Sequence, residues 1–288
     1  MVENNFIPHH MNITKHDMEG NGGIGRYVIL PGSDGRAREI SKRFKNVNVK
    51  THPRCHNFYS GELDVNGKKV DIAVVASGMG APSVDIIVNE LYRLGARRIL
   101  RIGTSGSLQP EYIRTGALVV PTGAVRDEGT SSAYMPREIP ALASLQFVNA
   151  AIAAIQKLGM GNVFFGIVHT KDSLYAREFK EGPMREENTR YMKLLKASGV
   201  LASEMECSLL FSLGNVFNTQ LVQKKIKSSR SIPTELQSFF LTGAILAVVG
   251  DDSAFSDPKE IAKAEERAIT LGIETIKELA KKELEIQD

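Results

Sequence analysis

The chain has little cysteine and little net charge, and each shortage excludes a class of protein. Among 288 residues there are two cysteines, Cys55 and Cys207, which lie far apart without a metal-ligand spacing. A formal net charge of +3 is too small to predict binding to nucleic acid or to a membrane surface. We therefore expect a small-molecule partner, with single arginines available to bind a small anion.

Long apolar runs are also missing. The run FFLTGAILAVVG (239–250) is far shorter than the ~18 apolar residues of a membrane span, so it predicts a buried strand. The N-terminal sequence MVENNFIPHH is polar and lacks the basic-then-apolar order of an export signal. These features and the sparse cysteines predict a soluble protein of the reducing cytoplasm.

What the sequence does contain is a series of short β-rich runs separated by helical segments. With 42% hydrophobic and 24% charged residues, the composition is that of a globular chain. Several runs are nearly continuous in Val, Ile, Leu and Ala, as in strands covered on both faces. The predicted strands are 26–32, 68–78, 97–106, 116–125, 163–173 and 239–251.

Helices are predicted at 83–94 and 142–158, each followed by a glycine. A last helix starts at Asp257, where an N-cap residue is followed by Pro258. Alternation of strands and helices predicts one mostly parallel α/β layered domain over residues 1–288. The polar, basic stretch 218–238 interrupts a helix-to-strand step, and we interpret it as an inserted surface or interface segment.

Glycine-rich stretches differ in their context. Gly20, Gly22 and Gly25 have the spacing of a dinucleotide-binding fingerprint, but a strand follows them where a helix is needed, so we expect a lead-in loop. PGSDGR (31–36), SGMGAPS (77–83) and RIGTSGS (101–107) instead adjoin the ends of predicted strands. Ligands of open α/β sheets bind at such ends, where free backbone N–H groups hold anions.

Arginines accompany these stretches. Arg36 ends the first, Arg54 lies in THPRCHNF, and Arg101 falls inside the apolar run ILRIG, where it needs a partner. Guanidinium groups fit phosphate oxygens, although any one arginine also fits a surface ion pair. Together with the glycines they indicate a phosphate site.

The segment LASEMECSLLF (201–211) places Glu204 and Glu206 inside an apolar run. A carboxylate removed from water is costly unless it is paired, so both need partners.

The motifs LPGSDGR, SGMGAPS, LRIGTSGSLQP and LASEMEC, in this order, resemble the nucleoside phosphorylases of the uridine and hexameric purine type. KDSLY and AVVGD are more similar to the uridine branch. The resemblance implies a three-layer α/β/α sandwich around a mixed, mostly parallel sheet. It also implies cleavage of a nucleoside by inorganic phosphate, yielding ribose 1-phosphate and free base, without metal or organic cofactor.

The resemblance also implies site residues, with Arg101 and Glu206 as the catalytic pair. Arg54 and His10 would reach the site of a neighbouring subunit, so at least a homodimer is implied, and hexamers of dimers remain open. Phosphate would be held by Gly32, Arg36, Arg54, Arg101 and Thr104, ribose by His10, Met205 and Glu206, and the base by Ser105, Gly106, Tyr175, Arg177 and Asp251.

The sequence departs from the family at the base end, where it reads SLYAREFKEG. Leu174 replaces an aromatic residue, and Arg177 stands near the position of an expected glutamine. Asp251 or Asp252 lies near the position of the acid that protonates a leaving purine, although the pair also fits a solvated position before the last helix. Cys55 replaces a glutamate that some members use beside an interface cation, so no metal is expected.

Several functions are consistent with these residues. We expect uridine phosphorolysis, with purine phosphorolysis as the alternative. A nucleoside hydrolase, a non-catalytic nucleoside-binding protein on the same fold and, as an outside possibility, a nicotinamide-linked oxidoreductase remain open. We expect Glu206 to contact ribose and Glu204 to be structural, with backbone N–H groups or an arginine as its partner.

Overall fold

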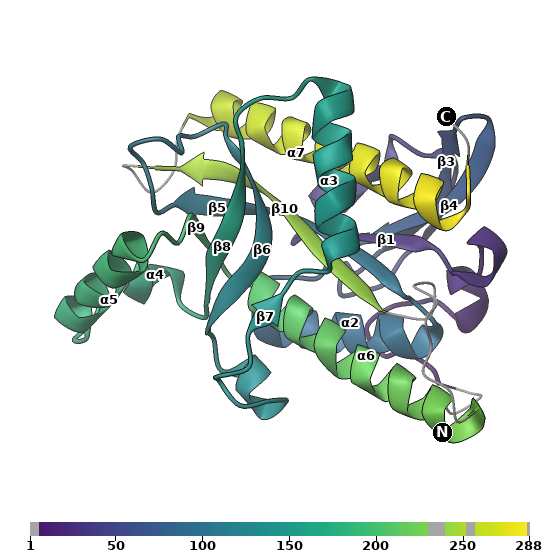
Figure 1. The fold of residues 1–288 in the computed structure, drawn as a ribbon, viewed down its shortest axis with the longest axis horizontal. Helices are drawn as coiled ribbons and strands as arrows, with labels where there is room; N and C mark the ends of the chain where they lie inside the picture. Colours follow the sequence, from purple (N-terminus) through teal and green to yellow (C-terminus); the bar gives the residue numbers. More distant parts are fainter. Residues whose placement is uncertain (1–5, 230–239, 252–256, 287–288) are drawn as a thin grey trace.

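The computed structural model describes residues 6–229, 240–251 and 257–286, whose strands join in one mixed sheet (Figure 1). The strand order is β10-β6-β8-β9-β5-β1-β4-β3-β2, and β7 pairs with β6. The strands are β1 (Tyr27–Leu30), β2 (Lys45–Lys50), β3 (Phe58–Val65), β4 (Lys68–Val75), β5 (Arg98–Ser107), β6 (Leu118–Asp127), β7 (Ala141–Leu142), β8 (Val163–Lys171), β9 (Ala202–Glu204) and β10 (Leu241–Gly250).

Helices cover both faces of this sheet. One apolar core packs α2 and α6 on one face, and a second packs α1, α3 and α7 on the other. This confirms the three-layer sandwich expected from the sequence. The helices are α1 (Asp34–Ser41), α2 (Ala81–Leu94), α3 (Leu145–Leu158), α4 (Leu174–Arg177), α5 (Arg185–Ala197), α6 (Cys207–Ser229) and α7 (Pro258–Glu283), with short 3₁₀ helices at Lys15–Met18, Asn21–Gly23 and Thr130–Ala133.

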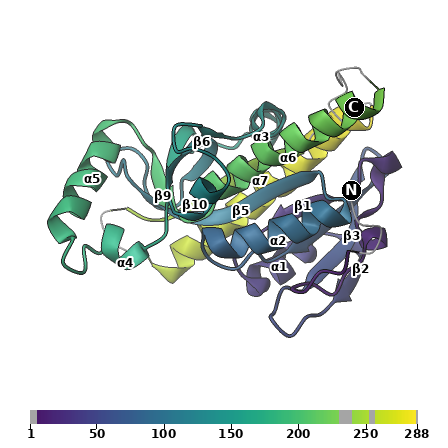
Figure 2. The same ribbon diagram turned by 90° about the horizontal axis from the view of Figure 1, so that it is seen from below.

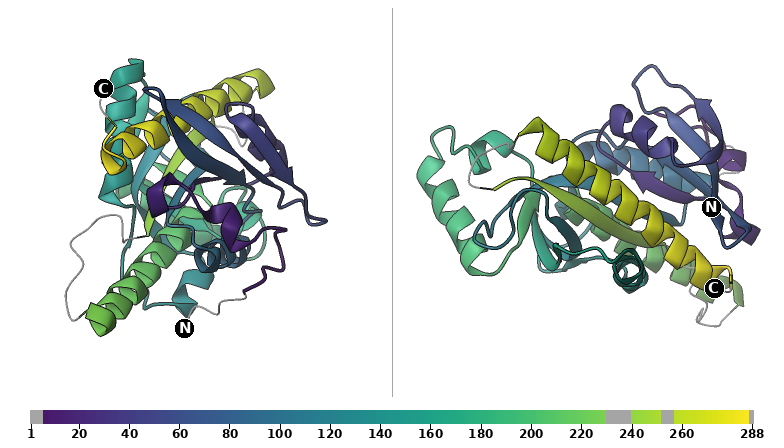
Figure 3. Two further views of the ribbon diagram at one scale, coloured as in Figure 1. Left: turned by 90° about the vertical axis from the view of Figure 1, so that its right-hand side faces the viewer. Right: turned by 90° about the horizontal axis from the view of Figure 1, so that it is seen from above.

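Part of the sheet closes on itself because β10 pairs with both β5 and β6. Strands β8 and β9 complete the ring, since β6 is parallel to β8, β8 is parallel to β9, and β9 is antiparallel to β5. Helix α7 runs along β10 (Figure 3, right), whereas α4 and α5 lie at the end of the molecule away from β2 and β3 (Figure 2). The ring therefore brings the ends of β5, β8 and β9 together.

Local chemistry explains the helix boundaries. Gly95 and Gly159 take left-handed φ values of 112° and 59° and terminate α2 and α3. The side chain of Asp257 accepts a hydrogen bond from the backbone N–H of Lys259, which caps α7. Helix α3 begins later than expected, at Leu145, because residues 141–142 pair with β6 instead.

The structure also tests two other predictions from the sequence. The strand Tyr27–Leu30 follows the glycines at 20–25, and no long helix does, so the chain lacks a dinucleotide fingerprint there. The polar stretch at 218–238 does not begin as an interruption, since residues 218–229 continue α6. Its remainder, 230–238, lies outside the described residues.

Candidate active site

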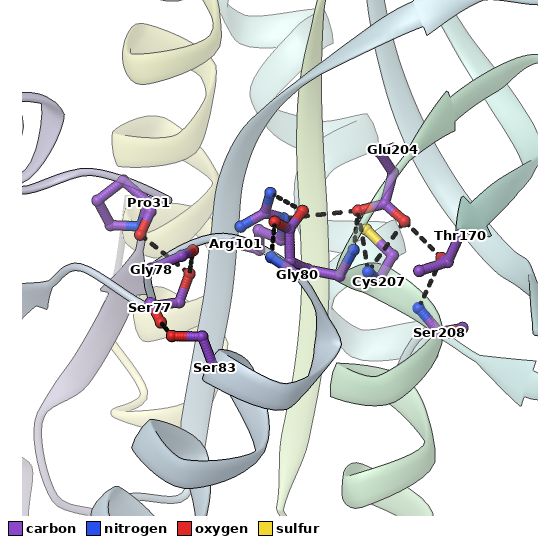
Figure 4. A network of polar contacts seen from close by, with 11 residues as sticks. Pro31, Ser77, Gly78, Gly80, Ser83, Arg101, Thr170, Glu204, Cys207 and Ser208 are labelled. Carbon is purple, nitrogen blue, oxygen red and sulfur yellow. Dashed lines mark hydrogen bonds and ion pairs between the residues drawn. The ribbon is translucent and has the colours of Figure 1, made fainter. Parts of the chain in front are cut away.

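The loops after β1 and β4 lie against each other at the carboxyl ends of these parallel strands (Figure 4). The backbone N–H of Ser77 donates to the carbonyl of Pro31 at 2.8 Å, and Ser83 Oγ donates to the carbonyl of Ser77 at 2.6 Å. Gly78 has φ +77°, and a Cβ there would collide with Ser83. Two of the three glycine-rich stretches therefore meet, while the third, 101–107, is the end of β5 itself.

Arg101 of β5 is the buried cation of this region (Figure 4). Its Nη2 donates to Glu206 Oε2, and its Nε lies 3.7 Å from Glu204 Oε2. Burial opposes the charge of Arg101, but Glu206 and Glu204 together raise its pKa above the usual value. Its Nε and Nη1 make no hydrogen bond within the described residues, which leaves donors for an anion.

Glu204 has the structural partners that the sequence left unnamed. Its carboxylate accepts hydrogen bonds from the backbone N–H groups of Glu206 at 2.8 Å and Cys207 at 2.9 Å, and from the hydroxyl of Thr170. Burial, followed by the charge of Glu206, raises the pKa of Glu204. The expected backbone donors and the arginine are both present, so Glu204 ties the start of α6 to β8 and β5.

Glu206 lies beside Arg101 at the start of α6. Its Oε1 accepts a hydrogen bond from the backbone N–H of Gly80 at 2.8 Å, and its Oε2 pairs with Arg101. Met205, between the two glutamates, is half-buried. The expected ribose carboxylate is therefore placed between the β4 loop and the buried arginine.

The other residues expected to bind phosphate are distributed around this centre. Gly32 lies in the loop after β1, next to the carbonyl of Gly78. Arg36 of α1 pairs with Glu265 of α7 and retains a buried Nε without a hydrogen bond. Thr104 lies in β5, three residues beyond Arg101.

The two residues expected to act across a subunit boundary lie elsewhere in this chain. Arg54 is exposed in a turn between β2 and β3, where its backbone N–H donates to His52 Nδ1 at 3.2 Å. His10 Nδ1 contacts Glu90 Oε1 of α2 at 2.8 Å. The single chain therefore does not bring Arg54 into contact with Arg101 or Glu206, and the predicted contribution to a neighbouring site stays a prediction.

At the base end, Gly106 of β5 pairs with Ser203 of β9 and with Gly250 of β10. Ser105 is buried, and its Oγ has no hydrogen-bond partner in the described part of the chain. Tyr175 is 60% exposed and packs edge-to-face on Phe179.

The other two residues expected at the base are already engaged. Arg177 Nη2 donates to Asp127 Oδ1 at 2.8 Å, its Nη1 donates to Asn188, and its guanidinium lies over the ring of Tyr191. Asp251 accepts a hydrogen bond from the backbone N–H of Thr115 at 3.1 Å. Asp252 lies outside the described residues.

The sequence prediction missed a polar cluster at the end of β8. His169 Nε2 contacts Asp127 Oδ2 at 2.9 Å, and its Nδ1 contacts Ser203 Oγ at 3.0 Å. Lys171 Nζ lies 2.9 Å from the same Oγ and 2.5 Å from Glu178 Oε1. The available signal was the polar HTK (169–171) at the end of the apolar β8 run.

Burial and hydrogen bonds set the protonation of this cluster. Burial lowers the pKa of His169, against the opposing effect of Asp127. Burial would raise the pKa of Asp127, but hydrogen bonds from His169 and Arg177 hold it below its usual value. We therefore assign a neutral His169 that donates from Nε2 to an ionised Asp127.

Within residues 6–229, 240–251 and 257–286, no three His, Cys, Asp or Glu side chains are grouped to hold a metal ion. Over the same ranges, no helix has both the length and the apolar character needed to cross a membrane.

Comparisons with known proteins identify the family and the fold. Residues 26–225 match the family model described as the Phosphorylase superfamily. A uridine phosphorylase of Treponema pallidum is 33% identical over 257 residues, covering 88% of this chain and 89% of its own length. A guanosine phosphorylase of Halorubrum lacusprofundi is 28% identical over 198 residues, covering 69% of this chain and 76% of its own length.

The fold has solved counterparts. The crystal structure of a uridine phosphorylase from Vibrio fischeri superimposes with a TM-score of 0.71 at 24% identity, covering 95% of this chain and 98% of that one. On the extent of the family match and the identity to the Treponema protein, this chain belongs to the phosphorylase superfamily.

Proposed function

We propose that this chain catalyses the phosphorolysis of uridine, giving uracil and ribose 1-phosphate. One observation carries the proposal: Arg101 is buried between two carboxylates and still has guanidinium N–H groups free to bind an anion. Family membership and relatives described as uridine phosphorylases over most of this chain support the same reaction.

Phosphate is the nucleophile of this reaction, and no side chain forms a bond to the sugar. One phosphate oxygen bonds to C1′ of ribose while the bond from C1′ to N1 of uracil breaks, and the electrons of that bond move onto the base. The sugar passes through an oxocarbenium-like state, which the phosphate anion stabilises. The uracil anion takes up the proton that hydrogen phosphate loses on forming ribose 1-phosphate, so the reaction balances without a metal or an organic cofactor.

The residues have separate tasks in this reaction. Arg101, Arg36 and the backbone at Gly32 hold phosphate beneath C1′, and the carboxylate of Glu206 accepts hydrogen bonds from the ribose hydroxyls. Substrate binding requires Glu206 to share or release Arg101, which gives phosphate access to the guanidinium. A neighbouring copy supplies Arg54 and His10 to complete the site.

An assay of phosphorolysis with uridine, thymidine, inosine and adenosine, each with and without phosphate, tests the proposal. We expect uridine to be cleaved only when phosphate is present, and Arg101→Ala to abolish this activity. Cleavage of inosine without cleavage of uridine would assign the chain to purine phosphorolysis, the alternative that the 28% identity to a guanosine phosphorylase supports less than the uridine phosphorylases support uridine. Turnover unaffected by phosphate removal would indicate a hydrolase.

A further inference from the structure

Lys171 is a buried cation that the proposed reaction has not used. It ends β8 and is 2% exposed, which is rare for a lysine unless it is paired. Arg177, the cation expected at the base from the sequence, has donors committed to Asp127 and Asn188. Lys171 is therefore the candidate to consider in place of Arg177 for contact with the base.

Two contacts of Lys171, with Ser203 and Glu178, connect it to Gly106, one of the residues expected to bind the base. Its Nζ lies 2.9 Å from Oγ of Ser203, which pairs with Gly106 across β5 and β9. The same Nζ lies 2.5 Å from Glu178 Oε1. A Cβ placed on Gly106 would lie 3.4 Å from Glu178 Oε2, so the Glu178 carboxylate sits over Gly106.

A second layer of contacts fixes this pair. Because an ammonium only donates, Ser203 Oγ accepts from Lys171 and is free to donate its own proton to Nδ1 of neutral His169. His169 is held in turn by Asp127 at 2.9 Å. This series of hydrogen bonds, from Asp127 through His169 to Ser203, therefore fixes the position of the Lys171 ammonium.

We propose that Lys171 and Glu178 recognise the base by its imide edge, the N–H group that adjoins a carbonyl oxygen. This inference rests on the proposed nucleoside phosphorolysis and names its base specificity. The ammonium donates to O4 of uracil or thymine, and the carboxylate accepts from N3–H. A 6-oxopurine presents the same order of groups through O6 and N1–H.

Bases with the opposite pattern are rejected. Cytosine and adenine present an amino group to the ammonium and an unprotonated ring nitrogen to the carboxylate, which sets donor against donor and acceptor against acceptor. The same lysine also favours bond cleavage. When the electrons of the glycosidic bond move onto the base, part of the negative charge reaches the carbonyl oxygen beside Nζ.

The test compares Lys171→Met and Glu178→Gln with wild type, using uridine, cytidine and N3-methyluridine as substrates. N3-methyluridine retains O4 but cannot donate to Glu178. We expect wild type to prefer uridine over N3-methyluridine by ~100-fold or more in kcat/KM, and Glu178→Gln to reduce this preference at least ~10-fold. Lys171→Met lowers kcat/KM for uridine ~100-fold, while KM for phosphate changes less than about twofold.

Matched variants separate recognition from folding. Lys157→Met removes a lysine that pairs with Glu274 between α3 and α7, away from the site, and should retain wild-type turnover. If Lys171→Met alone does not fold, the double variant Lys171→Met/Glu178→Gln removes both charges, and loss of the uridine preference is measured in it. An unchanged ratio of uridine to N3-methyluridine in folded Glu178→Gln or in the folded double variant would overturn the inference.

Base binding is measured separately from catalysis. Calorimetry should detect uracil binding to wild type, and this affinity should fall at least ~10-fold in Lys171→Met. If wild type binds uracil in this way but cleaves no nucleoside, the proposed phosphorolysis fails and the recognition by Lys171 stands. Equal uracil affinity in wild type and Lys171→Met would refute the recognition alone.

Discussion

Arg101 depends on a small neighbour in its own strand. A Cβ on Gly103 would lie 2.9 Å from Arg101 Nη2 and 3.1 Å from its Cζ, so the guanidinium folds over the glycine. Both ends of this guanidinium are held by carboxylates, which limits how far it can move aside.

Gly103→Ala should therefore displace the phosphate-binding donors. We expect kcat/KM for phosphate to fall ~10–100-fold, since a misplacement of about 1 Å costs this order of rate. Gly161→Ala is the control, because a Cβ there meets nothing within 4 Å. Steady-state kinetics with phosphate varied would count against the arrangement if the two variants behaved alike.

Substitutions of Glu204 and Glu206 should differ in their effects on stability and on turnover. Glu204→Ala leaves the buried N–H groups of Glu206 and Cys207 and the hydroxyl proton of Thr170 without an acceptor, so the free energy of unfolding should fall by ~3 kcal/mol. Urea titration measures this loss, and Glu204→Gln should recover part of it.

Glu206→Ala removes the proposed ribose contact and should lower kcat/KM for uridine ~100-fold or more. This change also breaks the ion pair with buried Arg101 and leaves the backbone N–H of Gly80 without its acceptor, so stability should fall as well and turnover is the quantity that distinguishes the two variants. Steady-state kinetics of the two variants, measured under conditions where both are folded, compares their turnover. Equal losses of turnover would show that the two carboxylates share one role.

At the scale of elements, glycines mark where α6 packs on the sheet. A Cβ on Gly214 of α6 would lie 2.8 Å from Thr242 Oγ1 of β10, whereas one on Gly35 of α1 meets nothing. A change from glycine to alanine should therefore lower the stability at one of these positions and raise it at the other. Gly214→Ala should destabilise by about 1–3 kcal/mol through overpacking, and Gly35→Ala should stabilise by about 0.5–1 kcal/mol through helix propensity. Thermal or urea unfolding of both variants measures the difference.

Strand β8 should confer a pH dependence on stability. The folded pKa of His169 is lowered by burial, so the unfolded chain takes up a proton at this residue first as the pH falls. The free energy of unfolding should decline by up to about 1.4 kcal/mol per pH unit from about pH 6.5 down to the folded pKa. Urea unfolding at several pH values should show this slope, and His169→Gln should lack it.

The elements predicted from sequence are those whose pattern is local. Local sequence is enough to predict the strands with apolar runs, which are β1, β5, β6, β8 and β10, and the end of α2 at its glycine. Strand β2 reads KNVNVK and is largely exposed, so only its pairing with β3 makes it a strand. Helix α3 was extended too far because nothing local indicates that residues 141–142 pair with β6.

The candidate site divides in the same way. Arg101, Glu204 and Glu206 can be identified from the sequence because each is a charged residue inside an apolar run and therefore needs a partner. Lys171 lies at the end of its apolar run, in HTK, where a charge needs no buried partner, and its contacts with Ser203 and Glu178 depend on the pairing of β8 with β9 and on the turn through α4. Arg177 is predicted from the sequence to contact the base because its ion pair with Asp127 joins residues 50 positions apart, which no local pattern indicates.

For the molecule as a whole, the proposed site is incomplete in one chain. Arg54 is exposed in its turn and does not contact Arg101, so the proposed phosphate contact of Arg54 depends on a neighbouring copy. In a symmetric dimer, each site then takes Glu206 from one subunit and Arg54 from the other.

Mixing inactive variants tests this arrangement. Arg54→Ala and Glu206→Ala should each be inactive alone, but equal co-expression should restore about one quarter of wild-type activity, because half of randomly paired dimers hold one intact site of two. Glu206→Ala with Arg101→Ala is the control. Both of these changes damage the site of their own subunit, so no pairing rebuilds it, and recovery there, or none with Arg54→Ala, would rule out a shared site.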